Sequence, residues 1–267
     1  MLEQVLADLD SESAVLRGRV AGLDAASWAS PTPARGWTVA HQIAHLTWTD
    51  ETAALAASAA AGDPDAARRW DSTLADALQE GSIDARAGEL ATLPPADLLA
   101  RWDGSRAAVA GALRRVGSAK IPWLGPPMKA TSMATARFME TWAHGLDVAA
   151  ARHQEPEPTD RIRHVCHLGV VTRRFAYGVR GRPAPTADVL VDLVAPSGVH
   201  WTWGDPSAGQ RISGSAWDFA RVAVRRMHPA DSDLVAVGAD AREWLGLMQA
   251  FAGPPGDEPP RLRPAQP

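Results

Sequence analysis

Two segments of the sequence place metal-ligating residue types four positions apart. Glu140 and His144 form one pair, and His41 and His45 form the other. On an α-helix, side chains four residues apart share a face and lie about 5 to 6 Å apart, so that one ion can bridge them. Carboxylates and imidazoles are ligands that zinc accepts. We therefore interpret Glu140 and His144 as a candidate clip for a divalent metal, completed by a histidine of the other segment.

The surroundings of this pair strengthen the interpretation. Its neighbours in the sequence include the apolar residues Phe138, Met139, Trp142 and Leu146. A carboxylate buried among apolar side chains needs a cation, because an unpaired buried charge is costly. A metal is one such cation, and Arg137 is the alternative. In the other segment the spacing alone does not choose between His41 and His45.

Hydrophobic spacing of three and four residues predicts the helices that would carry these side chains. The predicted helices span residues 2–23, 39–61, 95–116, 132–152 and 158–177. Thr38 is placed to cap the second of them. Residues 62–94 are predicted to be a connection, and the proline-rich residues 121–128 a loop.

The pattern changes after the prolines at 183 and 185. Alternation over residues 188–193 and the short aromatic run 200–203 predict strands, followed by helices over 216–227 and 241–251. The sequence thus predicts an α+β protein, with a helical domain over residues 1–180 and a small α/β domain over 181–255. Residues 256–267 are rich in proline and are predicted to be a disordered tail.

Composition narrows the classes of partner. The 27 basic and 31 acidic residues give a net charge of -4, so a nucleic acid is not the expected partner. No apolar run approaches the roughly 20 residues that span a bilayer, and we expect neither a membrane partner nor a secretory leader. The single cysteine, Cys166, cannot form an intramolecular disulfide and is interpreted as a core residue. These features predict a cytoplasmic protein.

Several motifs together resemble a known family. The strings Gly36-Trp-Thr-Val and Ala44-His45-Leu, with Glu140-x-x-x-His144-x-x-Asp147, are similar to the actinobacterial mycothiol-dependent maleylpyruvate isomerases. The resemblance covers nearly the whole chain. It implies a DinB-like four-helix bundle followed by a small domain similar to sterol carrier proteins. It also implies His45, Glu140 and His144 as ligands of Zn²⁺ or another divalent first-row metal, with His41 outside the set.

The resemblance further implies a thiol chemistry. Mycothiol would be the co-substrate, and a metal with an open position would lower the pKa of its thiol. Arg226 matches an arginine that the family requires and would bind a substrate carboxylate, the alternative being a surface arginine near a helix end. Asp147 would orient a metal-bound histidine, or else cap the helix or pair with Arg152.

The expected function is therefore that of a zinc-dependent thiol transferase or isomerase acting on a small anionic substrate. The alternative is a non-catalytic module that binds a metal or ligand in its bundle and a hydrophobic molecule in its C-terminal domain. A third possibility is a regulatory protein that reuses the bundle, because a fold does not determine a function.

Overall fold

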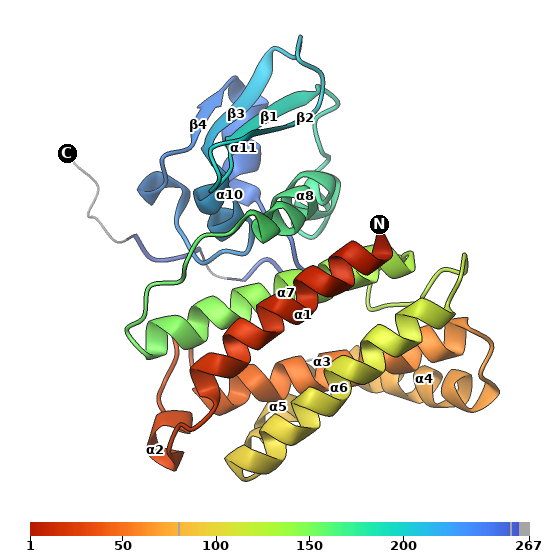
Figure 1. Ribbon diagram of the computed structural model, residues 1–267. Coiled ribbons are helices and arrows are strands. Elements are labelled where there is room, and N and C mark those ends of the chain that lie inside the picture. Colours follow the sequence, from red (N-terminus) through yellow and green to blue (C-terminus); the bar gives the residue numbers. More distant parts are fainter. Residues whose placement is uncertain (80, 257, 262–267) are drawn as a thin grey trace. The chain divides into compact units, whose positions relative to one another are not determined.

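The chain divides into two compact units, Met1–Pro156 and Glu157–Pro267. The structure, a computed structural model, describes residues 1–79, 81–256 and 258–261 (Figure 1). The first unit, here called the helical unit, consists of helices and loops, and the second, the mixed unit, contains a sheet. The predicted α+β class is thus confirmed. The division falls at residue 156, earlier than the predicted boundary between residues 180 and 181.

Four long helices form the framework of the helical unit. They are α1 (Leu2–Val20), α3 (Val39–Ala60), α6 (Pro95–Arg115) and α7 (Ala130–Ala151). The shorter helices are α2 (Ala25–Trp28), α4 (Pro64–Ala77) and α5 (Ser82–Ala91). Helix α3 packs against α4, α5, α6 and α7, and α1 packs against α7. Helix α3 therefore occupies the centre of this unit.

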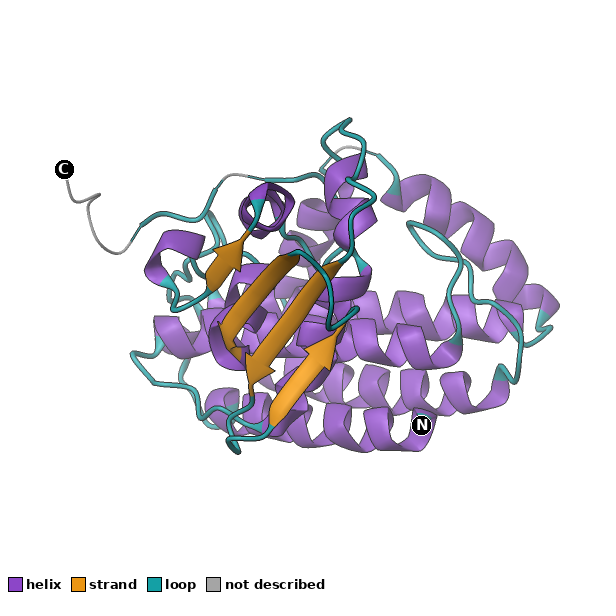
Figure 2. Ribbon diagram, turned by 90° about the horizontal axis from the view of Figure 1, so that it is seen from above, coloured by secondary structure: helices purple, strands orange, loops and turns teal. Residues whose placement is uncertain are grey.

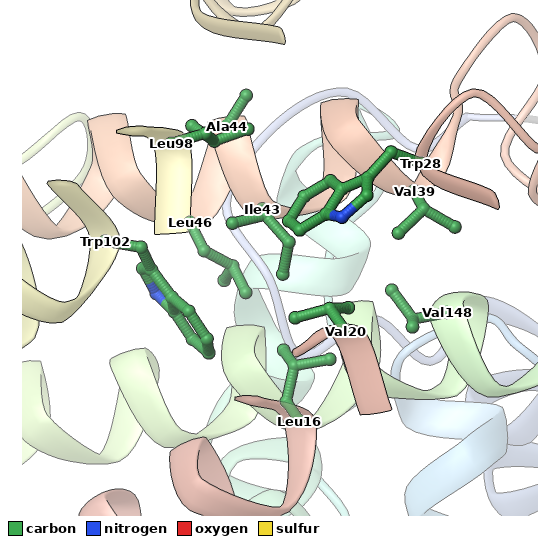
Figure 3. Packing of buried hydrophobic residues seen from close by; sticks show 10 residues of the cluster. All are labelled: Leu16, Val20, Trp28, Val39, Ile43, Ala44, Leu46, Leu98, Trp102 and Val148. Atoms are coloured by element: carbon green, nitrogen blue, oxygen red, sulfur yellow. The ribbon is translucent and has the colours of Figure 1, made fainter. Parts of the chain in front are cut away.

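A cluster of buried apolar side chains fixes these helices against one another (Figure 3). Ile43 and Leu46 of α3 contribute to the same core as Trp102 of α6, Leu16 of α1 and Val148 of α7. Full burial of a large apolar side chain contributes about 1.5 to 3 kcal/mol. The core thus sets the spacing of α3 and α7, the two helices that carry the predicted metal ligands.

The segment 62–94, which was predicted only as a connection, contains α4 and α5. The Asp63 side chain accepts hydrogen bonds from the backbone N–H groups of Asp65 and Ala66, and Pro64 occupies the first turn. An aspartate cap followed by proline is a strong helix start. The predicted loop 121–128 is confirmed as irregular, and mutual backbone hydrogen bonds between Ile121 and Met128 close it.

The mixed unit is built on a four-stranded sheet (Figure 2). Its strands are β1 (Val189–Val194), β2 (His200–Trp203), β3 (Gln210–Ser215) and β4 (Val235–Val237), in the order β2-β1-β3-β4. Strands β1 and β3 are parallel, and the other two pairs are antiparallel. Helix α10 (Ala216–Ala223) packs against β1 and β3, and α11 (Ala239–Leu247) packs against β3 and β4. The sequence predicted β1 and β2 but not β3 or β4.

The predicted helix 158–177 is divided into short pieces that belong to the mixed unit. They are the 3-10 turn Asp160–Ile162, α8 (Arg163–Val171) and α9 (Arg173–Gly178). Helix α8 packs against α10 so closely that a Cβ on Gly169 would lie 2.9 Å from the Phe219 ring. Cys166 donates to the carbonyl oxygen of Ala216 at 3.4 Å and is fully buried, as predicted for a core residue. These contacts place the boundary before α8.

Helix α10 ends earlier than the predicted residue 227. Arg225 adopts a left-handed conformation with φ of 57°, and the N–H of Arg226 donates to the carbonyl oxygen of Arg221 at 2.8 Å. This is the hydrogen-bond pattern that terminates many helices. Arg226 therefore lies just beyond the helix.

Across the described ranges, no helix is both long enough and apolar enough to cross a membrane. Of the predicted disordered tail 256–267, residues 257 and 262–267 lie outside the described residues.

Candidate metal centre

The structure brings together the three residues that the family resemblance implied as ligands. His45 comes from α3, and Glu140 and His144 come from α7, one turn apart. One ligand atom of each lies within 4.8 Å of the others. Glu140 Oε2 is 3.3 Å from His144 Nε2 and 3.6 Å from His45 Nε2. The packing of α3 on α7 thus joins two segments that are far apart in the sequence.

These distances suit a tetrahedral metal ion. Zinc binds imidazole nitrogen and carboxylate oxygen at about 2.0 to 2.2 Å, so tetrahedral ligand atoms lie about 3.4 Å from one another. The two distances from Glu140 Oε2 are close to this value. A nitrogen, oxygen and nitrogen donor set is also what zinc and its first-row neighbours accept. The residues present therefore fit a divalent metal.

Burial sets the protonation states that such a metal needs. Burial lowers the pKa of His45 to about 4, although the hydrogen bond to Glu140 opposes this change. Burial alone would raise the pKa of Glu140, but hydrogen bonds with His144 and His45 and the charge of Arg137 hold it well below its ordinary value. At neutral pH the cluster thus contains an ionised carboxylate and a neutral His45, and metal ligands must be deprotonated in this way.

Arg137, the alternative partner of Glu140, lies beside the cluster and does not replace it. Its Nη2 is 3.8 Å from Glu140 Oε1, while the two histidines face Oε2. Its Nη1 is 3.7 Å from the carboxylate of Asp50, which is buried on α3. Burial raises the pKa of Asp50 to about 6, against the opposite effect of Arg137. A chain of alternating charge therefore leads from the buried Asp50 and Arg137 to the partly buried Glu140.

Tryptophan rings lie beside the cluster and beside Arg137. The Trp37 ring is stacked on His144 at a centroid distance of 5.9 Å and lies 5.4 Å from the ring of His45. The guanidinium of Arg137 lies 5.8 Å from the centroid of Trp123, which is itself stacked on Trp70. These rings reduce contact with water around the ligands, which strengthens electrostatic interactions there.

The structure separates His41 from the ligand set. Its Nδ1 accepts the backbone N–H of Thr38 at 3.3 Å and lies 2.8 Å from Thr38 Oγ1. These contacts form a reciprocal cap at the start of α3. His41 thus serves the helix start, in line with its place outside the predicted set.

Gln42 is a site residue that the sequence reasoning missed. Its side chain is fully buried, and its Oε1 contacts His144 Nδ1. Asp147, which was predicted to orient a metal-bound histidine, is itself buried on α7. A buried amide one turn before His45, on the same helix, was the available signal.

Arg226 belongs to the mixed unit. Its Nη1 donates to the carbonyl oxygen of Val224 at 2.9 Å. Its binding of a substrate carboxylate stays a prediction, as does an orienting role for Asp147.

Comparisons with known proteins agree with this architecture. The family model for the mycothiol maleylpyruvate isomerase N-terminal domain matches residues 9–149, which include all three candidate ligands. Two uncharacterized proteins, from two strains of Mycobacterium tuberculosis, are each 48% identical over 252 residues, covering 94% of this chain and 96% of the relative. A crystal structure of the histidine-to-alanine mutant of a mycothiol-dependent maleylpyruvate isomerase aligns with a TM-score of 0.62. A second crystal structure of a mycothiol-dependent maleylpyruvate isomerase aligns with a TM-score of 0.58. Each is 17% identical, and each alignment covers 88% of this chain and 92% of the other. The chain therefore belongs to the mycothiol maleylpyruvate isomerase family.

Proposed function

We propose that the protein is a metal-dependent enzyme that activates mycothiol for S-transfer or for thiol-assisted isomerisation of a small anionic substrate. His45, Glu140 and His144 would hold Zn²⁺ or another divalent first-row metal. The observation that carries the proposal is the spacing of these ligand atoms, with Glu140 Oε2 at 3.3 and 3.6 Å from the two imidazole nitrogens. Three protein ligands are typical of catalytic zinc sites, which keep a position open.

The thiol part of the proposal is supported by family membership and by the chemistry of the ligand set. A metal at this site would lower the pKa of a bound thiol and so supply a thiolate at neutral pH. The chain has no cysteine for this role, because Cys166 is buried and burial raises its pKa. The nucleophile would therefore come from a small thiol.

The residues around the ligands have defined tasks in this proposal. Arg137 holds Oε1 of Glu140, which leaves Oε2 for the metal. Trp37 covers the two imidazole rings on one side. Arg226 would bind a carboxylate of the substrate with its planar set of donors.

The test begins with metal analysis of the purified protein beside three variants, His144→Ala, Glu140→Gln and His41→Ala. We expect a stoichiometric metal in the wild type and in His41→Ala, because His41 caps α3 and does not face the cluster. We expect its loss or strong weakening in the other two variants. Calorimetric titration with mycothiol should then show binding only in the metal-loaded proteins.

Two results would contradict the proposal. One is a wild type that takes up no first-row metal when zinc is supplied. The other is metal binding without any thiol binding, which would favour the non-catalytic module. Loss of metal from His41→Ala, with retention in His144→Ala, would refute the ligand assignment itself.

A further inference from the structure

A chain of hydrogen bonds connects His144 to the loop before α3. His144 Nδ1 contacts Oε1 of Gln42, and Gln42 Nε2 donates to Thr32 Oγ1 at 2.8 Å. Thr32 Oγ1 in turn donates to the carbonyl oxygen of Trp37 at 3.0 Å. Gln42 is fully buried, so its amide cannot exchange these hydrogen bonds for bonds to bulk water. The chain therefore ends on a backbone carbonyl.

That carbonyl determines the direction of every bond in the chain. A carbonyl oxygen can only accept, so the hydroxyl hydrogen of Thr32 must lie on its contact with Trp37. Thr32 Oγ1 is then an acceptor toward Gln42, which places the amide nitrogen of Gln42 at Thr32 and its oxygen at His144. An amide oxygen also only accepts, so His144 Nδ1 must carry the hydrogen.

We infer that Gln42 and Thr32 are positioning residues that hold His144 in the Nδ1–H tautomer. A hydrogen on Nδ1 leaves Nε2, which lies 3.3 Å from Glu140 Oε2, as the nitrogen that is available to a metal. His45 differs, because its buried Nδ1 has no hydrogen-bond partner among the described groups. The tautomer of one of the two candidate imidazole ligands is therefore fixed before any metal binds. As a role in metal binding, this inference rests on the proposed function.

The same bonds hold the loop that carries Trp37. Both the backbone N–H and the hydroxyl of Thr32 donate to the Trp37 carbonyl, at 2.8 and 3.0 Å. The Trp37 ring is stacked on His144. Gln42 thus ties the tautomer of the ligand to the position of the ring that covers it.

The tautomer can be measured without any metal. In the metal-free protein, nitrogen-15 NMR shifts of the imidazole distinguish the two neutral tautomers, at a pH well above the ordinary histidine pKa of about 6.5. The signal of His144 is assigned by its absence from His144→Gln. We expect Nδ1–H in the wild type and in Thr32→Ser, and a mixture of tautomers in Thr32→Val and Gln42→Leu.

Thr47→Val is the matched control, since the hydroxyl of Thr47 donates to the carbonyl oxygen of Ile43 in its own helix and takes no part in the chain of hydrogen bonds to His144. It should leave the His144 tautomer unchanged. A wild-type His144 in the Nε2–H tautomer would overturn the inference. Equal tautomer mixtures in Thr32→Val and Thr47→Val would also overturn it.

Metal affinity, measured by chelator competition, supplies the second readout. Partners of this kind are worth about 10-fold to 100-fold in affinity, which we expect Gln42→Leu to lose. Gln42→Glu keeps an acceptor for Nδ1 and should retain most of the affinity. If the wild type binds no metal but His144 is held as Nδ1–H, the proposed function fails and the positioning of His144 stands. If metal binds equally to the wild type and to Gln42→Leu, the positioning role in binding is refuted.

Discussion

Replacement of Arg137 by methionine tests the buried charge chain beside the candidate metal centre. Methionine keeps much of the volume of the side chain and removes its charge. In the wild type, Arg137 Nη1 is 3.7 Å from Asp50 and Nη2 is 3.8 Å from Glu140, and both Arg137 and Asp50 are buried. The variant leaves two carboxylates inside the helical unit without their shared cation.

The size of the effect follows from the pKa values. Loss of one partner of a buried ion pair costs about 3 to 5 kcal/mol when the other stays charged. Asp50 can avoid this cost by taking up a proton, because burial has already raised its pKa to about 6. At pH 7 that protonation costs about 1.4 kcal/mol. We therefore expect Arg137→Met to lose about 2 to 4 kcal/mol in free energy of unfolding at pH 7. This range includes the loss of the ion pair between Arg137 and Glu140.

The sign of the pH dependence is specific to Asp50. Without Arg137 the folded-state pKa of Asp50 rises above 6, further from its ordinary value of 3.8. A raised carboxyl pKa destabilises the folded state as the pH rises from the ordinary to the folded value. In the wild type this loss of stability is complete near pH 6, and in the variant it continues to a higher pH. The difference in free energy of unfolding should therefore widen by about 1.4 kcal/mol for each pH unit above 6 until the new pKa is reached.

The assay is urea denaturation of the metal-free proteins, followed by circular dichroism, at a series of pH values from 5 to 8. Arg137→Met combined with Asp50→Asn should lose the dependence above pH 6. Arg19→Met is the matched control, because Arg19 Nη1 donates to the carbonyl oxygen of Gly145 at 3.2 Å. It should follow the wild type above pH 6.

The reasoning would be refuted by a loss of stability in Arg137→Met that does not change between pH 6 and 8. A double variant that keeps the full pH dependence would refute it as well. Zinc offers a further check, because it would supply a cation beside Glu140 in place of the lost guanidinium. Zinc should therefore restore part of the stability of Arg137→Met.

Three further predictions concern single residues. Burial lowers the pKa of His45 from 6.5 to about 4. Between these pH values the unfolded chain binds a proton that the folded chain does not, so the metal-free protein should lose up to about 3 kcal/mol of stability as the pH falls from 6.5 to 4. Denaturation of His45→Gln should show a weaker pH dependence over this range. Gly204→Ala should destabilise the mixed unit by about 2 kcal/mol or more, because a Cβ would lie 2.5 Å from the carbonyl oxygen of Val189 at a φ of 94°; thermal melting checks this, and an unchanged melting temperature would contradict it. Cys166, which is buried with a raised pKa, should react with a thiol reagent only as fast as the protein unfolds, so rapid labelling of the native protein would count against its core position.

Local sequence was enough for the long helices and for the pair Glu140 and His144. The spacing of Glu140 and His144 on one helix face places them together whatever the rest of the fold does. Periodicity located α1, α3, α6 and α7 for the same reason, because it reports which face of each helix is buried. The choice of His45 over His41 needed the family resemblance, since both residues have helical spacing.

Tertiary structure alone decided which groups support those ligands. Gln42 meets His144 across 102 residues of sequence, and Arg137 joins Asp50 to Glu140 only when α3 packs on α7. Helix α8 belongs to the mixed unit because Gly169 lets it approach Phe219. Periodicity and capping act over a few residues, whereas hydrogen bonds and charges of buried side chains depend on which helices are neighbours. The ligands could therefore be predicted from sequence, and the groups that position them could not.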